Sequence, residues 1–391
     1  MTTTIHPVAP TFGRALCDRV EADLTEDVMR RAYWRLHRKA VLVGAWYIAS
    51  YVLMLLASNW IAGMLACVSF ALATVAVGFN IQHDANHNAF FRTGGRRRLS
   101  TANRIAGFSL NAIGGSAKRW IEGHVIIHHS SPNVVGRDHD IELAPFARLA
   151  PAQRRRPWHA FQHLYVWLVY AFTSGSIIVG DVISTIQESF TGDRNGKSPK
   201  VTEYVALACS KGLFLLFTIV IPLLFHPWWI VALGALLVLG VSGFLLGVVF
   251  QLAHVVEEAD FCEVTNRATG RWHEWQVRSS IGFCHGEGLV SRVLTWYAGG
   301  LNFQTEHHLF PSLPHTVYPH ISAIVTETCQ EFGIDRQVQP TLRGAVRSHY
   351  RHVRRLGRPD RAPEQGSAPH PDLAPDGAPA GAAPGRQRDA A

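Results

Sequence analysis

The apolar residues of this chain fall into long uninterrupted runs separated by strongly polar segments. Residues 40–57, 61–79 and 228–253 contain no Asp, Glu, Lys or Arg. Residues 204–225 are similarly apolar except for Lys211, which is near enough to the start of the run to reach the membrane interface. About 20 helical residues cross the roughly 30 Å hydrocarbon core of a bilayer. The four runs therefore predict four transmembrane helices in an all-α integral membrane protein, and they exclude an ordinary soluble domain.

Two features predict how the chain is oriented in the membrane: the short links between these runs, and the basic residues that flank the runs. The links at 58–60 and 226–227 are short and contain no Lys or Arg, so the runs form two hairpins. Basic residues are concentrated before the first run and after the second, as is typical of cytoplasmic segments. Both termini and the long central loop are therefore expected in the cytoplasm. These basic residues are Arg30, Arg31, Arg35, Arg38, Lys39, Arg92, Arg96, Arg97, Arg98 and Arg104.

Two further apolar segments are not expected to cross the membrane. Residues 105–117 are too short to do so. Residues 164–186 are long enough, but a crossing there would place Arg194, Lys197 and Lys200 outside. It would also divide, between the two sides of the membrane, histidine groups that otherwise share one side. We therefore expect residues 164–186 to lie in the membrane interface or to pack beneath the cytoplasmic part.

Composition narrows the class without indicating a second folded domain. Only 17% of the residues are charged, and the net charge of +8 fits cytoplasmic loops and anionic headgroups better than a nucleic-acid partner. The six cysteines form no CxxC pair, which argues against a disulfide framework and against a cysteine-ligated zinc site. We expect a cytoplasmic N-terminal segment at 1–39, a membrane domain at 40–357 and a disordered tail rich in Pro, Ala and Gly at 358–391.

Four groups of histidines stand near the predicted cytoplasmic ends of these runs. The first two groups read HDANH and HVIIHH, the third is the single histidine of QLAH, and the fourth reads QTEHH. Histidines four residues apart lie on one face of a helix and can hold one metal together. We interpret the remaining histidines, including His37, His139, His159, His163 and His285, as ordinary. The candidate metal ligands are His83, His87, His124, His128, His129, His254, His307 and His308.

The number of candidate ligands restricts the kind of metal site. Zinc takes three or four protein ligands, whereas eight imidazoles divide naturally between two six-coordinate ions, each with an open position. Imidazole also suits copper, nickel and zinc, so ligand type alone does not select the metal. An open two-metal nitrogen site beside lipid best suits iron that handles dioxygen. Carboxylates able to hold imidazole N–H groups are Asp84, Asp138, Asp140, Glu257, Glu258 and Glu306.

With these motifs in this order, the sequence resembles the membrane fatty acid desaturase family. HDANH, HVIIHH and QTEHH resemble its three histidine boxes, and VFQLAHVVEEADF resembles the segment that supplies a further ligand. GLNFQTEHHLFP is similar to bacterial acyl-lipid and linoleoyl-CoA-like members. The resemblance spans about residues 30–356 and implies a four-span, mushroom-shaped fold whose cytoplasmic helical cap holds two iron ions on the eight histidines above. Gln304 occupies a position where other relatives have histidine, so the sequence does not decide whether Gln304 binds an iron ion.

The resemblance also implies a reaction, in which dioxygen-dependent chemistry removes two hydrogens from an acyl chain carried by coenzyme A, a carrier protein or a lipid. An unactivated methylene has no acidic proton, so acid–base side chains alone cannot start such a reaction. His6-Pro7 lacks the Gly-Gly of a fused haem-domain signature. Electrons are therefore expected from a separate ferredoxin- or cytochrome-type protein and its reductase. The implied location is a bacterial inner membrane.

Other interpretations stay open at the level of sequence. The same boxes occur in membrane hydroxylases, ketolases and acetylenases, and the sequences SSPN after the second box and SIGFCHGEGLV depart from close relatives. A metal transporter is less favoured, because transporters place ligands near the bilayer midplane. Trp120 is a candidate wall of an acyl tunnel or a packed core aromatic. The basic triplets 96–98 and 154–156 either attract phosphates or an acidic carrier protein, or simply follow from the topology.

Overall fold

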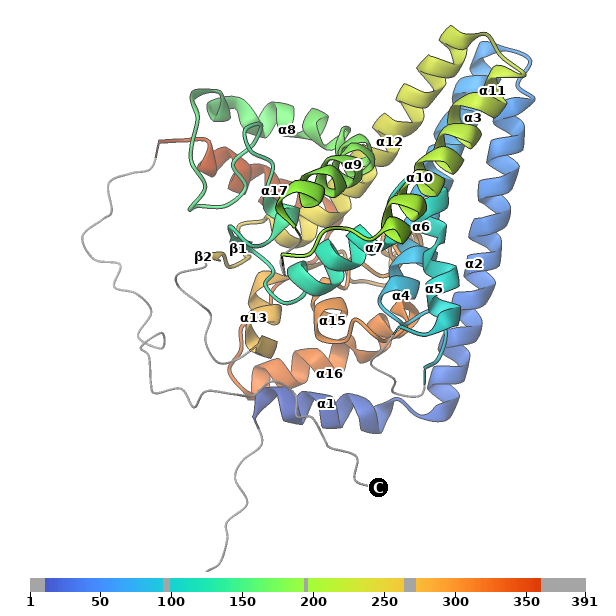
Figure 1. Cartoon of the computed structure of the whole chain (residues 1–391). Coiled ribbons are helices and arrows are strands. Elements are labelled where there is room, and N and C mark those ends of the chain that lie inside the picture. The colour runs from blue at the N-terminus through green and yellow to red at the C-terminus, as the bar shows by residue number, and fades with distance from the viewer. Residues whose placement is uncertain (1–10, 94–98, 193–195, 264–271, 360–391) are drawn as a thin grey trace, which may run out of the picture. The chain divides into compact units, whose positions relative to one another are not determined.

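The computed structural model of the chain describes residues 11–93, 99–192, 196–263 and 272–359. The predictions made for His6, for Arg96–Arg98, for Arg194 and for the tail beyond residue 359 lie outside these ranges. The described chain is mostly helical (Figure 1). Its strands form two parallel pairs of two residues each, β1 (Val134–Val135) with β2 (Cys262–Glu263) and β3 (Gly282–Phe283) with β4 (Val338–Gln339).

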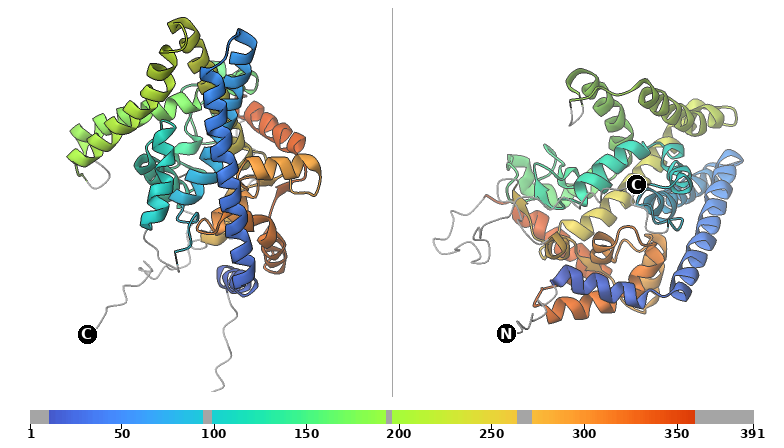
Figure 2. Two further views of the ribbon diagram at one scale, coloured as in Figure 1. Left: turned by 90° about the vertical axis from the view of Figure 1, so that its right-hand side faces the viewer. Right: turned by 60° about the horizontal axis from the view of Figure 1, so that its bottom comes forward.

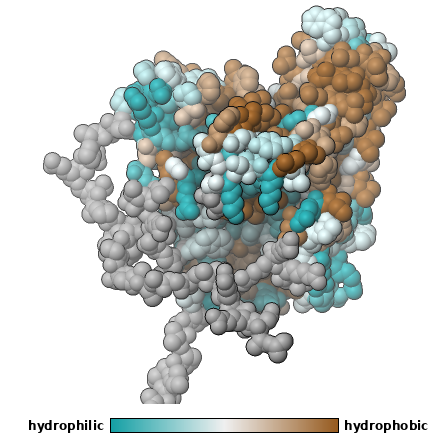
Figure 3. Space-filling view, in the orientation of Figure 1, coloured by the Kyte–Doolittle hydropathy of each residue, from teal (hydrophilic) through white to brown (hydrophobic). Residues whose placement is uncertain are grey.

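Four helices are long and apolar enough to cross a membrane, as the hydropathy pattern predicts. They are Glu26–Leu55, Trp60–Asn86, Val201–Leu223 and Trp228–His254. The first is α2 and the last is α12. The second consists of α3 (Trp60–Val77), a π-helical turn η1 (Gly78–Gln82) and α4 (His83–Asn86), and the third of α10 (Val201–Leu215), η5 (Leu216–Val220) and α11 (Ile221–Leu223). The apolar faces of these helices form the brown surface at the upper right of Figure 3, beneath a paler tip.

The short links between the long helices contain residues that start the next helix. In the first link, the side chain of Asn59 caps α3 by accepting a hydrogen bond from the backbone N–H of Ala62, at 2.9 Å. In the second, Pro227 immediately precedes α12. The ring of His226 donates to the carbonyl oxygen of Met54 at 3.1 Å, which joins the second link to the last turn of α2. α2 packs along α3, and α3 packs along α12 (Figure 2).

The segment predicted to lie in the interface forms two helices. They are α8 (Gln162–Tyr170) and α9 (Thr173–Thr191), and the helical stretches Pro157–Tyr170 and Thr173–Thr191 are bent by 78°. They count as a fifth candidate span only if both together make one broken crossing. The ammonium of Lys211 lies 2.7 Å from the carboxylate of Asp181 on α9. This largely buried ion pair joins α10 to α9, and the ammonium of Lys211 also donates to the carbonyl oxygen of Gly114 at 2.6 Å.

The remaining described segments are shorter and form the body that surrounds the histidines. The apolar segment 105–117 includes the end of α5 (Thr101–Gly107) and all of α6 (Ser109–Ala112), which are too short to span. α1 (Phe12–Asp23) packs against α16 (Tyr318–Glu331), and Leu16, Val20, Ile321 and Val325 are buried between them. The other elements are α7 (Ala117–Trp120), η2 (Ile121–His128), η3 (His139–Ile141), η4 (Pro157–Phe161), α13 (Trp272–Ser279), α14 (Leu289–Tyr297), α15 (Gln304–Leu309), η6 (His315–Val317) and α17 (Leu342–Leu356).

Candidate metal centre

The eight histidines singled out from the sequence converge from four separate segments. They lie on α4 and η2 or on the residue directly after them, at the end of α12 and on α15, and every one is buried. The first set that can share a metal is His83, His87, His124 and His307, whose ligand atoms all lie within 4.8 Å of one another. The second is His128, His254 and His308, with the same limit. His129 lies between the two, because it forms a further set with His307 and His308.

The local backbone of two of these segments is π-helical, which the spacing of the histidines did not predict. In η2 the backbone N–H of His129 donates to the carbonyl oxygen of His124 at 3.1 Å, five residues back. Such a turn is wider than an α-helical one, so residues four and five apart both lie near one face. His128 and His129 can therefore both follow His124 toward the cluster. The turn of η1 similarly precedes His83.

Several ring nitrogens of the cluster are buried without any hydrogen-bond partner among the described residues. They are Nε2 of His83, His87, His124, His128, His129 and His307, together with Nδ1 of His83 and His129. A buried polar atom that lacks a partner costs about 1–3 kcal/mol. Six such imidazoles in one place are therefore costly for an apoprotein, and bound cations would satisfy them. The donor set fits a metal ion.

The other two histidines of the cluster, His254 and His308, have their Nδ1 atoms held by hydrogen-bond acceptors outside the cluster. Nδ1 of His254 donates to the carbonyl oxygen of Ser279 at 3.0 Å, and Nδ1 of His308 donates to Oε1 of Gln276 at 2.8 Å. Both rings must then carry their lone pair on Nε2, and these two Nε2 atoms lie 3.2 Å apart. Two lone pairs that face each other repel, so a cation bound by both atoms would stabilise this arrangement.

Two aspartates fix the histidines of the second box. Nδ1 of His128 lies 3.0 Å from Asp138, and Nδ1 of His124 lies 3.2 Å from Asp140. Asp138 also accepts a hydrogen bond from the backbone N–H of Asn133 at 2.8 Å. Both aspartates thus orient imidazole rings, as the sequence analysis anticipated.

The three glutamates that the sequence offered as partners for imidazole rings have other surroundings. Glu306 forms a buried ion pair with Arg336, and Glu258 accepts hydrogen bonds from Gln339 and Ser348. Glu257 is exposed. These three carboxylates therefore face away from the histidines, because other segments of the body supply them with partners or leave them in solvent.

The electrostatic setting keeps most of the rings neutral and able to bind a metal. Burial, together with the neighbouring histidines, holds the pKa of His87, His129, His307 and His308 well below the usual value. Burial also lowers the pKa of His124 to about 4. His128 differs: burial opposes its charge, but the carboxylates of Asp138 and Asp140 prevail and raise its pKa to about 9. A metal at this ring would displace a proton.

Asp84 forms a hydrogen bond with His315, a residue that no sequence motif identifies. Its carboxylate lies 3.7 Å from Nδ1 of His83 and 2.9 Å from Nδ1 of His315. Nε2 of His315 in turn lies 2.9 Å from the ammonium of Lys39 on α2. His315 belongs to the histidines interpreted as ordinary, and its position after Pro314 carries no spacing signal. His37, His159 and His285 do bond ordinary backbone carbonyls, those of Phe90, Pro145 and Asn302.

Two further buried polar residues, Gln304 and Asn133, form hydrogen bonds with His254. Gln304 is buried, and its amide nitrogen lies 2.9 Å from Nε2 of His254, so this side chain is at the second histidine set. Asn133, in the segment that departs from close relatives, is also buried. Its amide donates to the carbonyl oxygens of His254 and Asp260, each at 3.0 Å. It thereby joins the segment after the second box to the end of α12.

A narrow apolar cleft leads to the histidines from the long helices. Its volume is about 100 Å³, and His83 and Trp120 lie among its lining residues. The indole of Trp120 stacks on the ring of His124, with centroids 4.5 Å apart, so this residue is part of the site and not of a distant core. Most of the wall is apolar and comes from α3, η1, α9, η5 and α12, including Val75, Phe79, Ile178, Phe217, Leu246 and Phe250.

Comparison with known proteins identifies relatives along most of the chain. A family model described as fatty acid desaturase matches residues 58–339. The sn-1 linoleoyl-lipid 6-desaturase of Arthrospira platensis is 31% identical over 91% of this chain and 96% of its own length. The protein of the same name from Synechocystis sp. is 29% identical over 89% and 96%. The acyl-lipid (8-3)-desaturase of Physcomitrium patens is 32% identical over 82% of this chain and 66% of its own length.

Proposed function

This chain belongs to the fatty acid desaturase family, and from that premise we propose that it introduces a C=C bond into an acyl chain carried by a membrane lipid. It is a membrane oxidoreductase, a fatty acyl desaturase. The choice of a lipid carrier over coenzyme A or a carrier protein rests on the relatives, whose names specify acyl-lipid or linoleoyl-lipid substrates. The observation that carries the proposal is the apolar cleft that ends at His83 and Trp120 beside the buried histidines.

We further propose that the cluster holds two iron ions. His83, His87, His124 and His307 would hold one, and His128, His254 and His308 the other. His129 lies close enough to both sets to complete either. Bound iron supplies the activation of dioxygen that removal of hydrogen from an unactivated methylene requires. Gln304, beside His254, is placed to contribute an amide oxygen or a bridging water at the second ion.

The residues of the chain position the acyl chain for this chemistry and exclude water from the site. The apolar cleft restrains an acyl chain along its length, so only one short stretch of methylenes can lie beside the histidines. Trp120, stacked on His124, forms the wall at that end. Burial of the cluster excludes bulk water, and Asp138 and Asp140 keep Nε2 of their histidines directed inward.

For the placement in the membrane, we propose two hairpins with a cytoplasmic helical cap and both termini in the cytoplasm of a bacterial inner membrane. The uncharged polar links at residues 58–60 and 226–227 would face the other side. The bend of 78° between the helices at 157–191 favours a segment that turns back in the interface over a straight crossing. Reporter fusions after residue 357 and within the link at 58–60 test this. Activity of a periplasm-dependent reporter at the first position, and not at the second, would contradict it.

We also propose that electrons reach the site from a separate ferredoxin- or cytochrome-type protein with its reductase. Iron–oxygen desaturation needs two electrons per double bond besides those of the substrate.

The test of the reaction is mass spectrometry of acyl chains from a host that expresses the protein with a redox partner. The variant His128→Ala removes one candidate ligand, and His320→Ala is the matched control, because His320 is exposed and pairs with Asp23. We expect products lighter by two hydrogens from the wild type and from His320→Ala, and none from His128→Ala. Products that gain oxygen, or desaturation that survives in His128→Ala, would overturn the proposal.

A further inference from the structure

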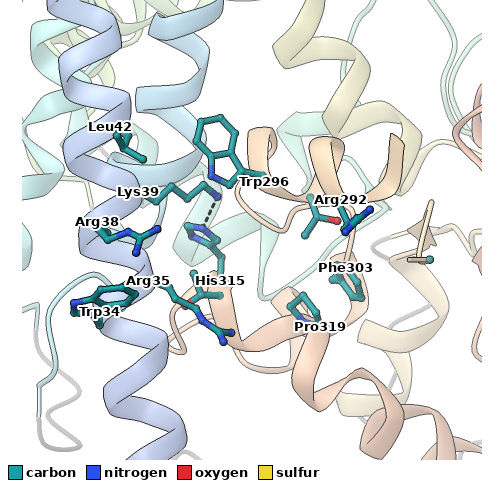
Figure 4. Close-up of a pocket in the computed structure, with 13 residues that line it drawn as sticks. Trp34, Arg35, Arg38, Lys39, Leu42, Arg292, Trp296, Phe303, His315 and Pro319 are labelled. Carbon is teal, nitrogen blue, oxygen red and sulfur yellow. Dashed lines mark hydrogen bonds between the residues drawn. The ribbon is translucent and has the colours of Figure 1, made fainter. Parts of the chain in front are cut away.

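A second cavity, separate from the apolar cleft, lies between α2 and the segment from Gly286 to Pro319. Its volume is about 540 Å³, within the range of small-molecule sites (Figure 4). The two cavities share none of their described lining residues. Four cationic side chains line this second cavity, and no Asp or Glu is among its described lining residues. They are Arg35, Arg38, Lys39 and Arg292.

The lining residues on α2 give the cavity a cationic end and an apolar end. Arg35, Arg38, Lys39 and Leu42 follow one another at the intervals that place residues on one face of a helix. Of these four residues, the three nearer the N-terminus of α2 are cationic, and Leu42, the fourth, is apolar and exposed. Arg292 lines the cavity from the facing helix, α14 (Figure 4). The sequence of charge followed by apolar surface matches the polarity of a phospholipid.

The three arginines of this cavity have no carboxylate partner among the described residues. Other arginines do: Arg19 pairs with Glu331, and Arg92 with Glu26. The guanidinium of Arg38 instead lies over the ring of Trp34, with 4.4 Å to the ring centroid. Topology alone requires basic residues at the end of a span, but it does not require a cation from a segment some 250 residues later to face the same space. Convergent, unpaired guanidinium groups are suited to phosphate.

The position of the cavity favours a ligand from the bilayer. Trp34 and Trp296 line it and are 59% and 41% exposed, as is typical of aromatic residues at a membrane interface. The neighbouring part of α14 exposes Leu289, Val290 and Val293, which gives this helix an apolar face beside the cavity. A ligand with a phosphate among the arginines would therefore extend over apolar surface.

We propose that this cavity binds the phosphate of a membrane phospholipid that is distinct from the reacting acyl chain. Arg35, Arg38 and Arg292 bind the phosphate, and Leu42 and Trp296 contact the glycerol and the first methylenes of the tails. Lys39 has a second role, since it lines the cavity and also contacts His315, which contacts Asp84. An occupant of this site thus adjoins the residues that support His83. The inference requires only that the chain is a membrane protein and does not depend on the reaction proposed above.

The test compares two double variants of α2 that remove the same charge. Arg35→Gln with Arg38→Gln removes two exposed cations from the cavity, and Arg30→Gln with Arg31→Gln removes two exposed cations elsewhere on the same helix. Each purified full-length protein, in an uncharged detergent, is titrated with dihexanoyl phosphatidylglycerol, and bound lipid is counted by native mass spectrometry. Dihexanoyl glycerol and inorganic phosphate are titrated in parallel.

We expect one phosphatidylglycerol to remain on the wild type and on the control double variant. The cavity double variant should bind it at least about tenfold more weakly, since each cation near a lipid phosphate is worth roughly fivefold in affinity. Dihexanoyl glycerol should not be retained. Equal loss in both double variants would assign the effect to the general charge of α2 and overturn the site. Displacement of the lipid by equimolar inorganic phosphate would overturn a lipid as the ligand, and so would equal retention by all three proteins.

Discussion

Asp84 and His315 are 231 residues apart in the chain, yet Oδ2 of Asp84 lies 2.9 Å from the ring Nδ1 of His315 and 3.1 Å from its backbone nitrogen. Both hydrogen bonds enter one carboxylate oxygen, so η6 is tied to α4 at the residue next to His83. Lys39 adds α2 to the same contact through Nε2 of His315. Helices α2, α4 and η6 thus meet at a buried cluster of polar and charged side chains next to His83, one of the candidate ligands.

Replacement of His315 by alanine tests the importance of this contact. The variant His315→Ala leaves Asp84 and Lys39 buried without their shared partner, and an unsatisfied buried charged group costs upward of about 1–3 kcal/mol. We expect a lower thermal unfolding midpoint and a lower iron content, because Asp84 no longer holds its position beside His83. Calorimetry and elemental analysis measure the two effects. His320→Ala is the control, and a His315→Ala protein that matches it in both measurements would contradict this role.

Asp138 offers a second test, at the other end of the cluster. Its carboxylate accepts from His128 and from the backbone nitrogens of Asn133 and Asp140. The variant Asp138→Asn keeps the size of the side chain but weakens its hold on the imidazole. Loss of such a supporting residue typically lowers metal affinity 10–100-fold. Competition with a chelator measures this, with Asp335→Asn, an exposed site, as the control. Equal metal retention in both variants would show that Asp138 does not support the ligand.

The apolar cleft can be narrowed without touching the histidines. Ile178 on α9 lines the cleft, whereas Ile183 on the same helix is 49% exposed. We expect Ile178→Trp to reduce desaturation at least about tenfold and to leave iron content unchanged, because the larger side chain occupies space that the acyl chain needs. Ile183→Trp should retain activity. The ratio of unsaturated to saturated chains measures the effect. Full activity of Ile178→Trp would place the acyl chain elsewhere.

The described body of the protein should lose stability on acidification. Burial lowers the pKa of His349 to about 4 and that of His352 to about 3, so both rings are neutral at pH 7. The unfolded chain takes up these protons near pH 6.5, before the folded protein does, and binding of protons by the unfolded state favours unfolding. Stability is therefore complete above about pH 6.5 and falls as the pH drops toward 4, by up to about 1.4 kcal/mol per pH unit for each ring.

The unfolding midpoint measured from pH 8 to pH 5 checks this. The double variant His349→Gln with His352→Gln removes both titrating groups and should show a shallower decline than the wild type. An identical slope in the two proteins would mean that these rings do not titrate between the folded and unfolded states.

Much of this architecture follows from local patterns in the sequence. Uncharged runs such as 228–253 predict membrane helices because the bilayer imposes their length, and α12 spans Trp228–His254. The gathering of the eight histidines was also predicted, because their spacing and their shared position at helix ends are properties of the linear sequence. Structure alone does not assign their roles as ligands, which stay part of the proposal.

Other features depend on contacts between distant segments and leave no local signal. The π-helical turn at His124 arises from backbone hydrogen bonds that a spacing of four does not reveal. Glu306 stands inside a histidine box but pairs with Arg336, thirty residues later. Lys211 pairs with Asp181, thirty residues earlier, because the fold brings α9 alongside α10. His315 reaches Asp84 only in the folded chain.

The central claim is that this histidine cluster holds two iron ions, and the ratio of iron to protein tests it most directly. The ratio is measured on the purified, iron-loaded full chain and on two variants, His87→Ala from the first histidine set and His254→Ala from the second. We predict two irons per wild-type chain and about one in each variant, since each substitution weakens one site. A wild-type ratio of one or below, or a variant ratio that stays at two, would contradict the account.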